Sequence, residues 1–190
     1  MSPPNIVYKF GAPLALASAG LMAFLGVWEP AHDNPGRVYP DMLAGGLPTV
    51  CKGITKHVSP YPVVLGDVWS EDRCAEVERM VTERSQLKLL DCIKVRVSQN
   101  TFDALSSHAH NFGVATTCVS KALGLINAGL LAEGCRSFAF KPDGTPNWSS
   151  VKTGRTLRNG EPEYRFVRGL HNRRKAEMAL CSKPDAPSHE

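Results

Sequence analysis

Apolar residues recur at helical spacing through the middle of the chain, and polar capping residues mark where the helices begin. One predicted helix has Ser98 as its N-cap and Gly113 as its stop, and its apolar positions are Phe102, Leu105, Ala109 and Phe112. An earlier helix is predicted from the N-cap Ser70 to about Leu90, with one apolar face made of Cys74, Val77 and Val81. These patterns predict amphipathic helices that pack against a core.

The C-terminal half continues the helical pattern. A helix is expected from Thr117 to Ala128, stopped by Gly129, and a short one around Gly134–Arg136. In the last helical segment Arg174 and Glu177 are three residues apart and can pair on one face. The basic run 173–175 is interpreted as a solvated helix face rather than a nucleic-acid patch.

Two short antiparallel β units interrupt the helices. Strand material is expected at Val38–Tyr39 and Pro48–Thr55. Asn159-Gly160 is a strong hairpin turn between strands at Val151–Leu157 and Glu163–Val167.

Length and charge limit the class of protein. At 190 residues the chain can build one sizeable core with a short appendage. The net charge of +4 is too small to indicate nucleic-acid binding, and it fits either approach to an anionic cell wall or simple solubility.

The six cysteines form an even set, which favours disulfides and an oxidising compartment over buried thiols. Zinc is disfavoured because the chain has no Cys-x-x-Cys pair and its histidines are scattered. His108 and His110 are two residues apart and would point to different faces of a helix. The spacing of the cysteines does not fix their connectivity.

Two carboxylates in unlike surroundings stand out near the start of the chain. Glu29 follows Trp28 at the end of an apolar run, which favours the protonated form of the acid. Asp41 follows Tyr39 in a polar turn, where it can stay ionised. Such a pair can supply one general acid and one general base. The plain alternative is a helix-terminal carboxylate and a turn residue.

The stretch from Val27 to Val58 resembles the catalytic segment of phage lysozymes of glycoside hydrolase family 24. Those enzymes carry a Glu on a helix, an Asp in a β-turn and a Thr on the next strand, then a Cys-x-Gly-x-Thr run, which here reads Cys51-Lys-Gly-Ile-Thr55. Eleven residues separate Glu29 from Asp41 and seven separate Asp41 from Thr49, more than is usual in the family. Turn formers at 33–36 and 45–46 indicate loop insertions that keep the geometry. Asp33, between the two acids, is interpreted as a turn or capping residue.

Later blocks extend the resemblance over residues 29–181. His108–Val114 is similar to the family's aromatic-Asn-x-Gly-Val run, Leu125–Gly129 to its Leu-Asn-Ala-Gly ending, and Gly169–Cys181 to its final Gly-Leu-x-x-Arg-Arg-x-x-Glu helix. The resemblance implies an α+β, lysozyme-like fold, mostly helical, with a small β lobe and a glycan cleft between lobes. It also implies the disulfides Cys51–Cys74, Cys92–Cys118 and Cys135–Cys181.

The resemblance implies a muramidase that hydrolyses the β-1,4 bond between N-acetylmuramic acid and N-acetylglucosamine in peptidoglycan, with no cofactor and no metal. Glu29 is then the general acid, Asp41 the water-positioning base and Thr49 its aid. Candidate substrate contacts are Asn111, Trp148 and Tyr164, each of which also has a structural interpretation. The alternatives are a lytic transglycosylase, which needs one acid and no water, and a non-enzymatic wall-binding or lysis-regulating protein.

The N-terminal stretch from Phe10 to Trp28 has no charged residue, and as a helix it would span about 28 Å. Ala17-Ser18-Ala19 looks like a signal-peptide cleavage site. A permanent membrane anchor is a second interpretation, although five alanines and three glycines make the stretch weakly apolar. The third is a signal-arrest-release segment, as in some phage endolysins, which leaves lipid when the membrane is depolarised. A thiol-based lock is disfavoured because no cysteine precedes Cys51.

The signal-arrest-release interpretation predicts how the chain is divided into segments. Residues 1–28 form the signal-arrest-release segment, 29–183 the catalytic domain and 184–190 a disordered tail. Lys9 before the apolar run places the N-terminus in the cytoplasm and the rest in the periplasm. The expected partners are the host Sec machinery, the host inner membrane through residues 10–28, and peptidoglycan strands; we expect a monomer and no nucleic acid.

Overall fold

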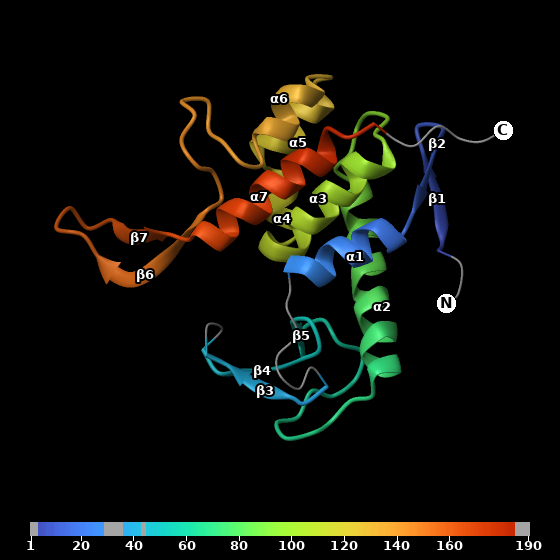
Figure 1. Cartoon of the computed structure of the whole chain (residues 1–190), viewed down its shortest axis with the longest axis vertical. Coiled ribbons are helices and arrows are strands. Elements are labelled where there is room, and N and C mark those ends of the chain that lie inside the picture. Colours follow the sequence, from blue (N-terminus) through green and yellow to red (C-terminus); the bar gives the residue numbers. More distant parts are fainter. Residues whose placement is uncertain (1–3, 29–35, 43–44, 185–190) are drawn as a thin grey trace. The chain divides into compact units, whose positions relative to one another are not determined.

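The computed structural model describes residues 4–28, 36–42 and 45–184. The chain divides into two compact units. The first contains Met1–Val7 and Ala15–Lys88, and the second contains Tyr8–Leu14 and Leu89–Glu190. Figure 1 shows their helices and strands.

The N-terminal stretch forms a β-hairpin followed by a helix. Strands β1 (Ile6–Lys9) and β2 (Ala12–Ala15) join through Phe10 and Gly11, which both have positive φ, as a tight two-residue hairpin requires. Helix α1 covers Ala19–Trp28, and the Ser18 hydroxyl accepts the backbone N–H of Leu21 at its start. In the part of the chain that the structure describes, no helix is long and apolar enough to cross a membrane.

The rest of the first unit is a three-stranded sheet and one long helix. The strands β3 (Tyr39–Asp41), β4 (Leu47–Val50) and β5 (Ile54–Thr55) are antiparallel neighbours in that order. Helix α2 covers Glu71–Leu90, and Ser70 accepts the backbone N–H of Arg73 as its N-cap. The predicted β unit and the predicted helix are both confirmed.

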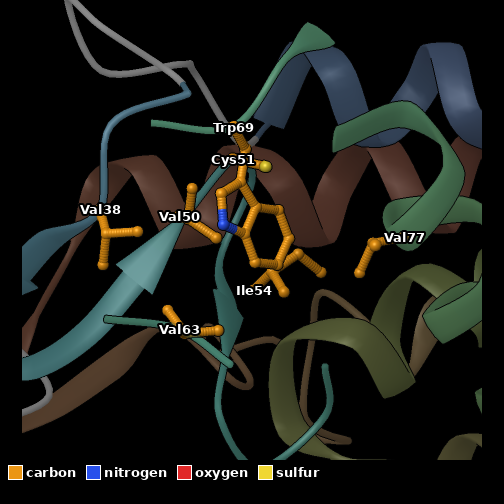
Figure 2. Packing of buried hydrophobic residues seen from close by; sticks show 7 residues of the cluster. All are labelled: Val38, Val50, Cys51, Ile54, Val63, Trp69 and Val77. Atoms are coloured by element: carbon orange, nitrogen blue, oxygen red, sulfur yellow. The ribbon is translucent and has the colours of Figure 1, made fainter. Parts of the chain in front are cut away.

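Sheet and helix share one apolar core, shown in Figure 2. Its buried members are Val38, Val50, Cys51, Ile54, Val63, Trp69 and Val77, with Cys74 and Val81 packed beside them. The predicted apolar face of the helix is therefore its core face. The Cys51–Cys74 disulfide ties the end of β4 to α2 across 23 residues.

A charged contact supports the same junction. Glu78 on α2 is buried and accepts both the backbone N–H of Lys52, at 3.2 Å, and its ammonium group, at 3.0 Å. One carboxylate thus satisfies a backbone donor and a nearby cation where β4 turns toward β5.

The second unit is helical. Its helices are α3 (Gln99–Phe112), α4 (Val114–Cys118), α5 (Lys121–Asn127), α6 (Leu131–Arg136) and α7 (Arg168–Cys181), with α3 packed on α7 and α5 on α6. Ser98 and Gly113 cap α3 as predicted, with Ser98 accepting the N–H of Thr101. The disulfides Cys92–Cys118 and Cys135–Cys181 complete the pairing that the family resemblance implies.

Two sequence-based expectations in this unit are wrong. The single helix expected over 117–128 is two helices, because Ser120 leaves helical geometry and starts a new helix by accepting the N–H of Leu123. The basic run 173–175 is not a solvated face throughout. Arg173 and Arg174 are buried and only Lys175 is exposed.

The predicted hairpin between the helices is present. Strands β6 (Ser150–Thr156) and β7 (Pro162–Phe166) pair antiparallel, with an irregularity between Lys152 and Thr156. The turn contains Asn159 and Gly160, and the glycine has φ 84°.

Candidate active site

Asp41 and Thr49 lie on neighbouring strands and on one face of the three-stranded sheet. Tyr39 is the cross-strand partner of Thr49, and Asp41 is the partner of Leu47. Residues two apart on a strand share a face, so Tyr39, Asp41, Leu47 and Thr49 all project from the same side. Asp41 and Thr49 are therefore diagonal neighbours, about 7–8 Å apart by ordinary sheet geometry, with their Cβ atoms somewhat closer.

Gly45 and Gly46 lead directly into β4. The N–H of Gly46 donates to the carbonyl of Asp41 at 2.7 Å, and pairing resumes at Leu47. Gly45 and Gly46 both have positive φ, a conformation that side-chain-bearing residues rarely adopt. Tyr39–Asp41 and Leu47–Thr49 therefore pair in an unbroken antiparallel register.

The two side chains differ in environment. The Asp41 residue is half-buried, whereas Thr49 is buried. The Thr49 hydroxyl donates its proton to the carbonyl of Leu47 at 3.0 Å, so its oxygen lone pairs remain the groups that can accept a further hydrogen bond.

The segment before this sheet is fixed at Gly36. Trp69 donates its N–H to the carbonyl of Gly36 at 2.7 Å, and Arg37 and Val68 form a bridge beside it. A Cβ on Gly36 would lie 2.3 Å from the carbonyl oxygen of Trp69, so only glycine fits. This contact sets where the chain enters β3 and hence where Asp41 lies.

Glu29 and Asp33 lie outside the described residues. Helix α1 ends at Trp28, directly before Glu29, and the Trp28 ring contacts Phe24 at 6.3 Å between centroids. The start of α1 is held by Gln86 of α2, whose side-chain oxygen accepts the N–H of Ala17 at 2.7 Å. The helix that leads into Glu29 is therefore tied to the first unit by a buried hydrogen bond.

The predicted substrate contacts belong to the second unit and differ in exposure. Asn111 is exposed near the end of α3, and Tyr164 is exposed on β7. Trp148 is half-buried, with its ring 4.8 Å from that of Phe112 and 5.0 Å from that of His108. The packing of Trp148 favours a core role, while Asn111 and Tyr164 are open to solvent.

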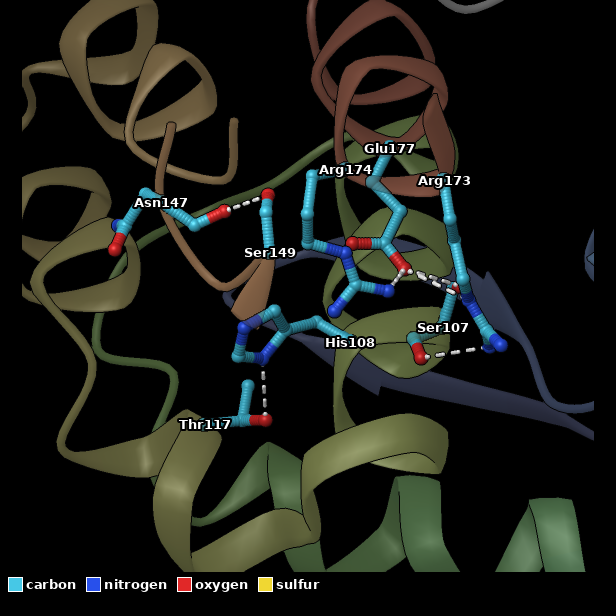
Figure 3. Close-up of polar contacts among 8 residues, drawn as sticks. All are labelled: Ser107, His108, Thr117, Asn147, Ser149, Arg173, Arg174 and Glu177. Carbon is cyan, nitrogen blue, oxygen red and sulfur yellow. Dashed lines mark hydrogen bonds and ion pairs between the residues drawn. The ribbon is translucent and has the colours of Figure 1, made fainter. Parts of the chain in front are cut away.

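The second unit also contains a buried polar cluster, shown in Figure 3. Arg174 donates to Glu177 Oε1 at 2.6 Å, and the Ser107 hydroxyl donates to the same oxygen at 2.7 Å. Arg173 lies 3.5 Å from that oxygen. Burial raises the pKa of Glu177, while Arg174 and Ser107 act in the opposite direction. The spacing of Arg174 and Glu177 predicted this pair, but nothing in the sequence pattern indicated Ser107.

His108 lies in the same cluster and is neutral. The Thr117 hydroxyl donates to the carbonyl of Gly113, so Nδ1 of His108 donates to Thr117 at 2.8 Å. Burial, followed by the charges of Arg174 and Arg173, lowers the pKa of His108 to about 3. His108 is thus a core residue of this unit rather than a general base near neutral pH.

Within the described ranges, no group of three or more His, Cys, Asp and Glu side chains is placed to hold a metal ion. An open groove of about 500 Å³ in the second unit is lined by residues that include Arg136, Phe140 and Met178. None of the candidate residues that the structure describes, Asp41, Thr49, Asn111, Trp148 and Tyr164, lines it.

The comparisons with known proteins agree with one another. The phage lysozyme family model matches residues 36–177. The SAR-endolysin of Pseudomonas phage phiKMV is 32% identical over 176 residues, which cover 93% of this chain and 92% of the relative.

Two solved structures are similar over nearly the whole chain. The endolysin from Escherichia coli O157:H7 phage FAHEc1 aligns with a TM-score of 0.70 and 24% identity, covering 92% of this chain and 97% of that one. The muramidase domain of SpmX from Asticaccaulis excentricus aligns with a TM-score of 0.69 and 20% identity, covering 94% and 100%. The fold is therefore lysozyme-like α+β, as expected, and the chain belongs to the phage lysozyme family.

Proposed function

We propose that this protein is an endolysin with muramidase activity, which hydrolyses the β-1,4 bond between N-acetylmuramic acid and N-acetylglucosamine of peptidoglycan. The observation that carries the proposal is the pairing of β3 and β4, which brings Asp41 and Thr49 to one face of one sheet. Membership of the phage lysozyme family and the likeness to a SAR-endolysin support the substrate class.

In the proposed mechanism Glu29 is the general acid. It gives its proton to the glycosidic oxygen as the bond to the anomeric carbon breaks, so the leaving sugar departs as an alcohol. The apolar helix α1 ends next to Glu29, and an apolar neighbourhood favours the protonated carboxyl that this step needs.

Asp41 is the base on the other side of the reaction. Its carboxylate takes a proton from a water molecule while the water oxygen bonds to the anomeric carbon, and it offsets the positive charge that develops on the sugar ring. Thr49 positions the same water by accepting a hydrogen bond from its other O–H group, since the Thr49 hydroxyl itself donates a hydrogen bond to the carbonyl of Leu47. Inversion of configuration requires the two carboxyl groups about 6.5–9.5 Å apart.

The exposed side chains of Asn111 and Tyr164 are proposed to contact the glycan. Trp148 contributes mainly by fixing the ring of Phe112, which lies next to Asn111 at the end of α3. No step in this mechanism uses a metal or a cofactor.

Activation is proposed to follow release from the membrane. Residues 10–28 are first held in the host inner membrane after Sec export, with the catalytic domain, 29–183, in the periplasm. In the described fold the same stretch buries Leu14, Leu16, Leu21 and Leu25 and ends in α1. Once the segment has left the bilayer, the backbone N–H of Ala17 at the start of α1 can bond to the side chain of Gln86. Docking of α1 in this way brings Glu29 to its catalytic position.

The test is analysis of the ends released from purified peptidoglycan. Hydrolysis gives reducing N-acetylmuramic acid ends whose anomeric hydroxyl takes its oxygen from solvent water. In water labelled with oxygen-18, each new end therefore carries one labelled oxygen that mass spectrometry detects. Anhydro-muramic ends without the label would assign the protein to the lytic transglycosylases. No new ends of either kind would support a wall-binding protein without catalysis.

A further inference from the structure

The β6–β7 hairpin exposes both of its faces. Every residue of β6 is exposed, and in β7 only Glu163 is partly covered. Figure 1 shows the orange and red hairpin extending away from the helices of the second unit. An uncovered two-stranded hairpin adds little stability in water, so its side chains are available for contacts outside the chain.

The strand register sorts these side chains onto two unlike faces. Lys152 lies opposite Tyr164, and Ser150 lies opposite Phe166, so these four residues share one face with the pair Thr156 and Pro162. We call this set the aromatic face. It carries one cation, two aromatic rings and no carboxylate.

The opposite face has a different character. Val151 pairs with Arg165, and the Thr153 hydroxyl donates to the Glu163 carboxylate at 2.6 Å. Glu163, the one acidic residue of β6 and β7, thus lies on this opposite face and is already hydrogen-bonded within the hairpin.

Both rings of the aromatic face are exposed, and the ring of Phe166 is also held by a contact with the next helix. Tyr164 is 58% exposed and Phe166 is 50% exposed. The Phe166 ring contacts that of His171 on α7 at 5.8 Å, and the next residue, Val167, donates its N–H to the carbonyl of Ser149 at 2.8 Å. Side chains that are already ordered lose little conformational entropy when they bind a partner.

We propose that the aromatic face is a docking surface for a peptidoglycan strand, on residues separate from the three catalytic groups. The rings of Tyr164 and Phe166 stack on the apolar faces of sugar rings, and Lys152 pairs with a carboxylate of a stem peptide. A cationic face without carboxylates complements a polymer that carries them. The proposal rests on the proposed function for its choice of polymer and assigns that function a second contact with the substrate.

A lipid surface fits the hairpin less well. A membrane-binding hairpin needs its apolar side chains at the end that enters the bilayer. Here Phe166 is at the base of the hairpin, next to α7, while the turn contains Asn159 and the carboxylate of Glu161. If the rings of Tyr164 and Phe166 entered a bilayer, the Glu161 carboxylate in the turn would lie against an anionic membrane surface and be repelled by it.

The experiment compares two neighbouring cross-strand pairs on opposite faces. The double variant Lys152→Ala/Tyr164→Ala removes one cation and one exposed ring from the aromatic face. The matched control Val151→Ala/Arg165→Ala removes one cation and one apolar side chain from the other face. Purified full chains are sedimented with intact sacculi and, separately, with phosphatidylglycerol-containing vesicles, and Tm is recorded for each variant.

The aromatic-face variant is expected to bind sacculi about tenfold more weakly than the parent, the combined effect of one stacking contact and one exposed ion pair. The control variant is expected to bind like the parent. The Tm of both variants is expected to stay close to that of the parent, because the substituted side chains lie on an exposed hairpin.

Three outcomes overturn the proposal: unchanged sedimentation of the aromatic-face variant, equal weakening of both variants, or a loss confined to vesicles, which would assign the face to lipid. Sedimentation does not need turnover. If the parent binds sacculi through this face but releases no fragments, the proposed muramidase activity fails and the docking surface stands.

Discussion

Arg174 and Glu177 form an ion pair inside the helical unit, with Nη2 of the arginine 2.6 Å from Oε1 of the glutamate and both side chains fully buried. The guanidinium also lies 4.8 Å from the ring of Phe112. The pair links α7 to α3, because the Ser107 hydroxyl donates to the same carboxylate oxygen. Removing either Arg174 or Glu177 leaves the other charge buried without its nearest ion-pair partner.

Arg174→Met is therefore expected to lower the free energy of unfolding by about 3–5 kcal/mol, the usual cost of breaking a buried pair. The double variant Arg174→Met/Glu177→Leu removes both charges and is expected to recover most of this loss. Urea unfolding at neutral pH measures both. A single variant within about 1 kcal/mol of the parent would contradict a structural role for the pair.

His108 predicts a pH dependence of stability. Its pKa is about 3 in the folded chain, against the ordinary value of 6.5 for an unfolded chain, so the unfolded chain binds a proton that the folded chain does not. The stability contribution of the neutral ring is complete above pH 6.5 and is lost as the pH falls toward 3.

The parent should thus lose stability in this range by up to about 1.4 kcal/mol per pH unit more than His108→Gln does. His57→Gln, at an exposed position, is the matched control and should keep the slope of the parent. The measurement is the free energy of unfolding at a series of pH values. Parallel curves for the parent and His108→Gln would refute this account of His108.

Any side chain at position 36 is expected to clash with the backbone of Trp69 and destabilise the fold. Gly36→Ala places a Cβ 2.3 Å from the backbone oxygen of Trp69, which cannot move aside as a side chain would. The expected loss is about 1–3 kcal/mol in the free energy of unfolding. Gly26→Ala is the control, because it has open space around its Cβ within α1 and should be neutral or gain up to about 1 kcal/mol. Equal thermal shifts for the two variants would argue against the Gly36 contact.

The sequence pattern predicted the parts of the fold that local chemistry dictates. Ser70, Ser98 and Gly113 are capping residues whose roles depend on their own backbone, and each was placed correctly. The Asn159-Gly160 turn was found for the same reason. The helix break at Ser120 was missed because serine is compatible with a helix interior and only its bond to Leu123 shows the restart.

Burial depends on long-range packing and was less predictable. Arg173 and Arg174 look like surface residues by type, yet Arg173 donates to the carbonyl of Ser107 on α3 and Arg174 donates to the buried carboxylate of Glu177. For the candidate site, the strands that carry Asp41 and Thr49 are antiparallel neighbours, while the catalytic roles of Asp41, Thr49 and Glu29 stay predictions. The apolar stretch after Lys9 gave no sign of the β1–β2 hairpin, because its tight turn needs positive φ at Phe10, which a phenylalanine rarely adopts.

Substitution of Asp41 is expected to abolish most of the catalytic activity while the fold stays intact. Asp41→Asn keeps the shape of the side chain but removes the proton acceptor, so turnover of peptidoglycan should fall by about 10²–10⁴. Asp67→Asn, an exposed position in the same unit, should retain the activity of the parent. Both rates are measured on purified sacculi with Tm as the check on folding. A similar rate for Asp41→Asn and the parent would exclude Asp41 as the base.

The central claim is tested most directly by mass analysis of the peptidoglycan fragments that the parent and Glu29→Gln release. Glu76→Gln, an exposed carboxylate on α2, serves as the control. The account predicts reducing muramic ends from the parent and from Glu76→Gln, and their loss from Glu29→Gln. Undiminished reducing ends from Glu29→Gln would contradict the role of Glu29 as the general acid.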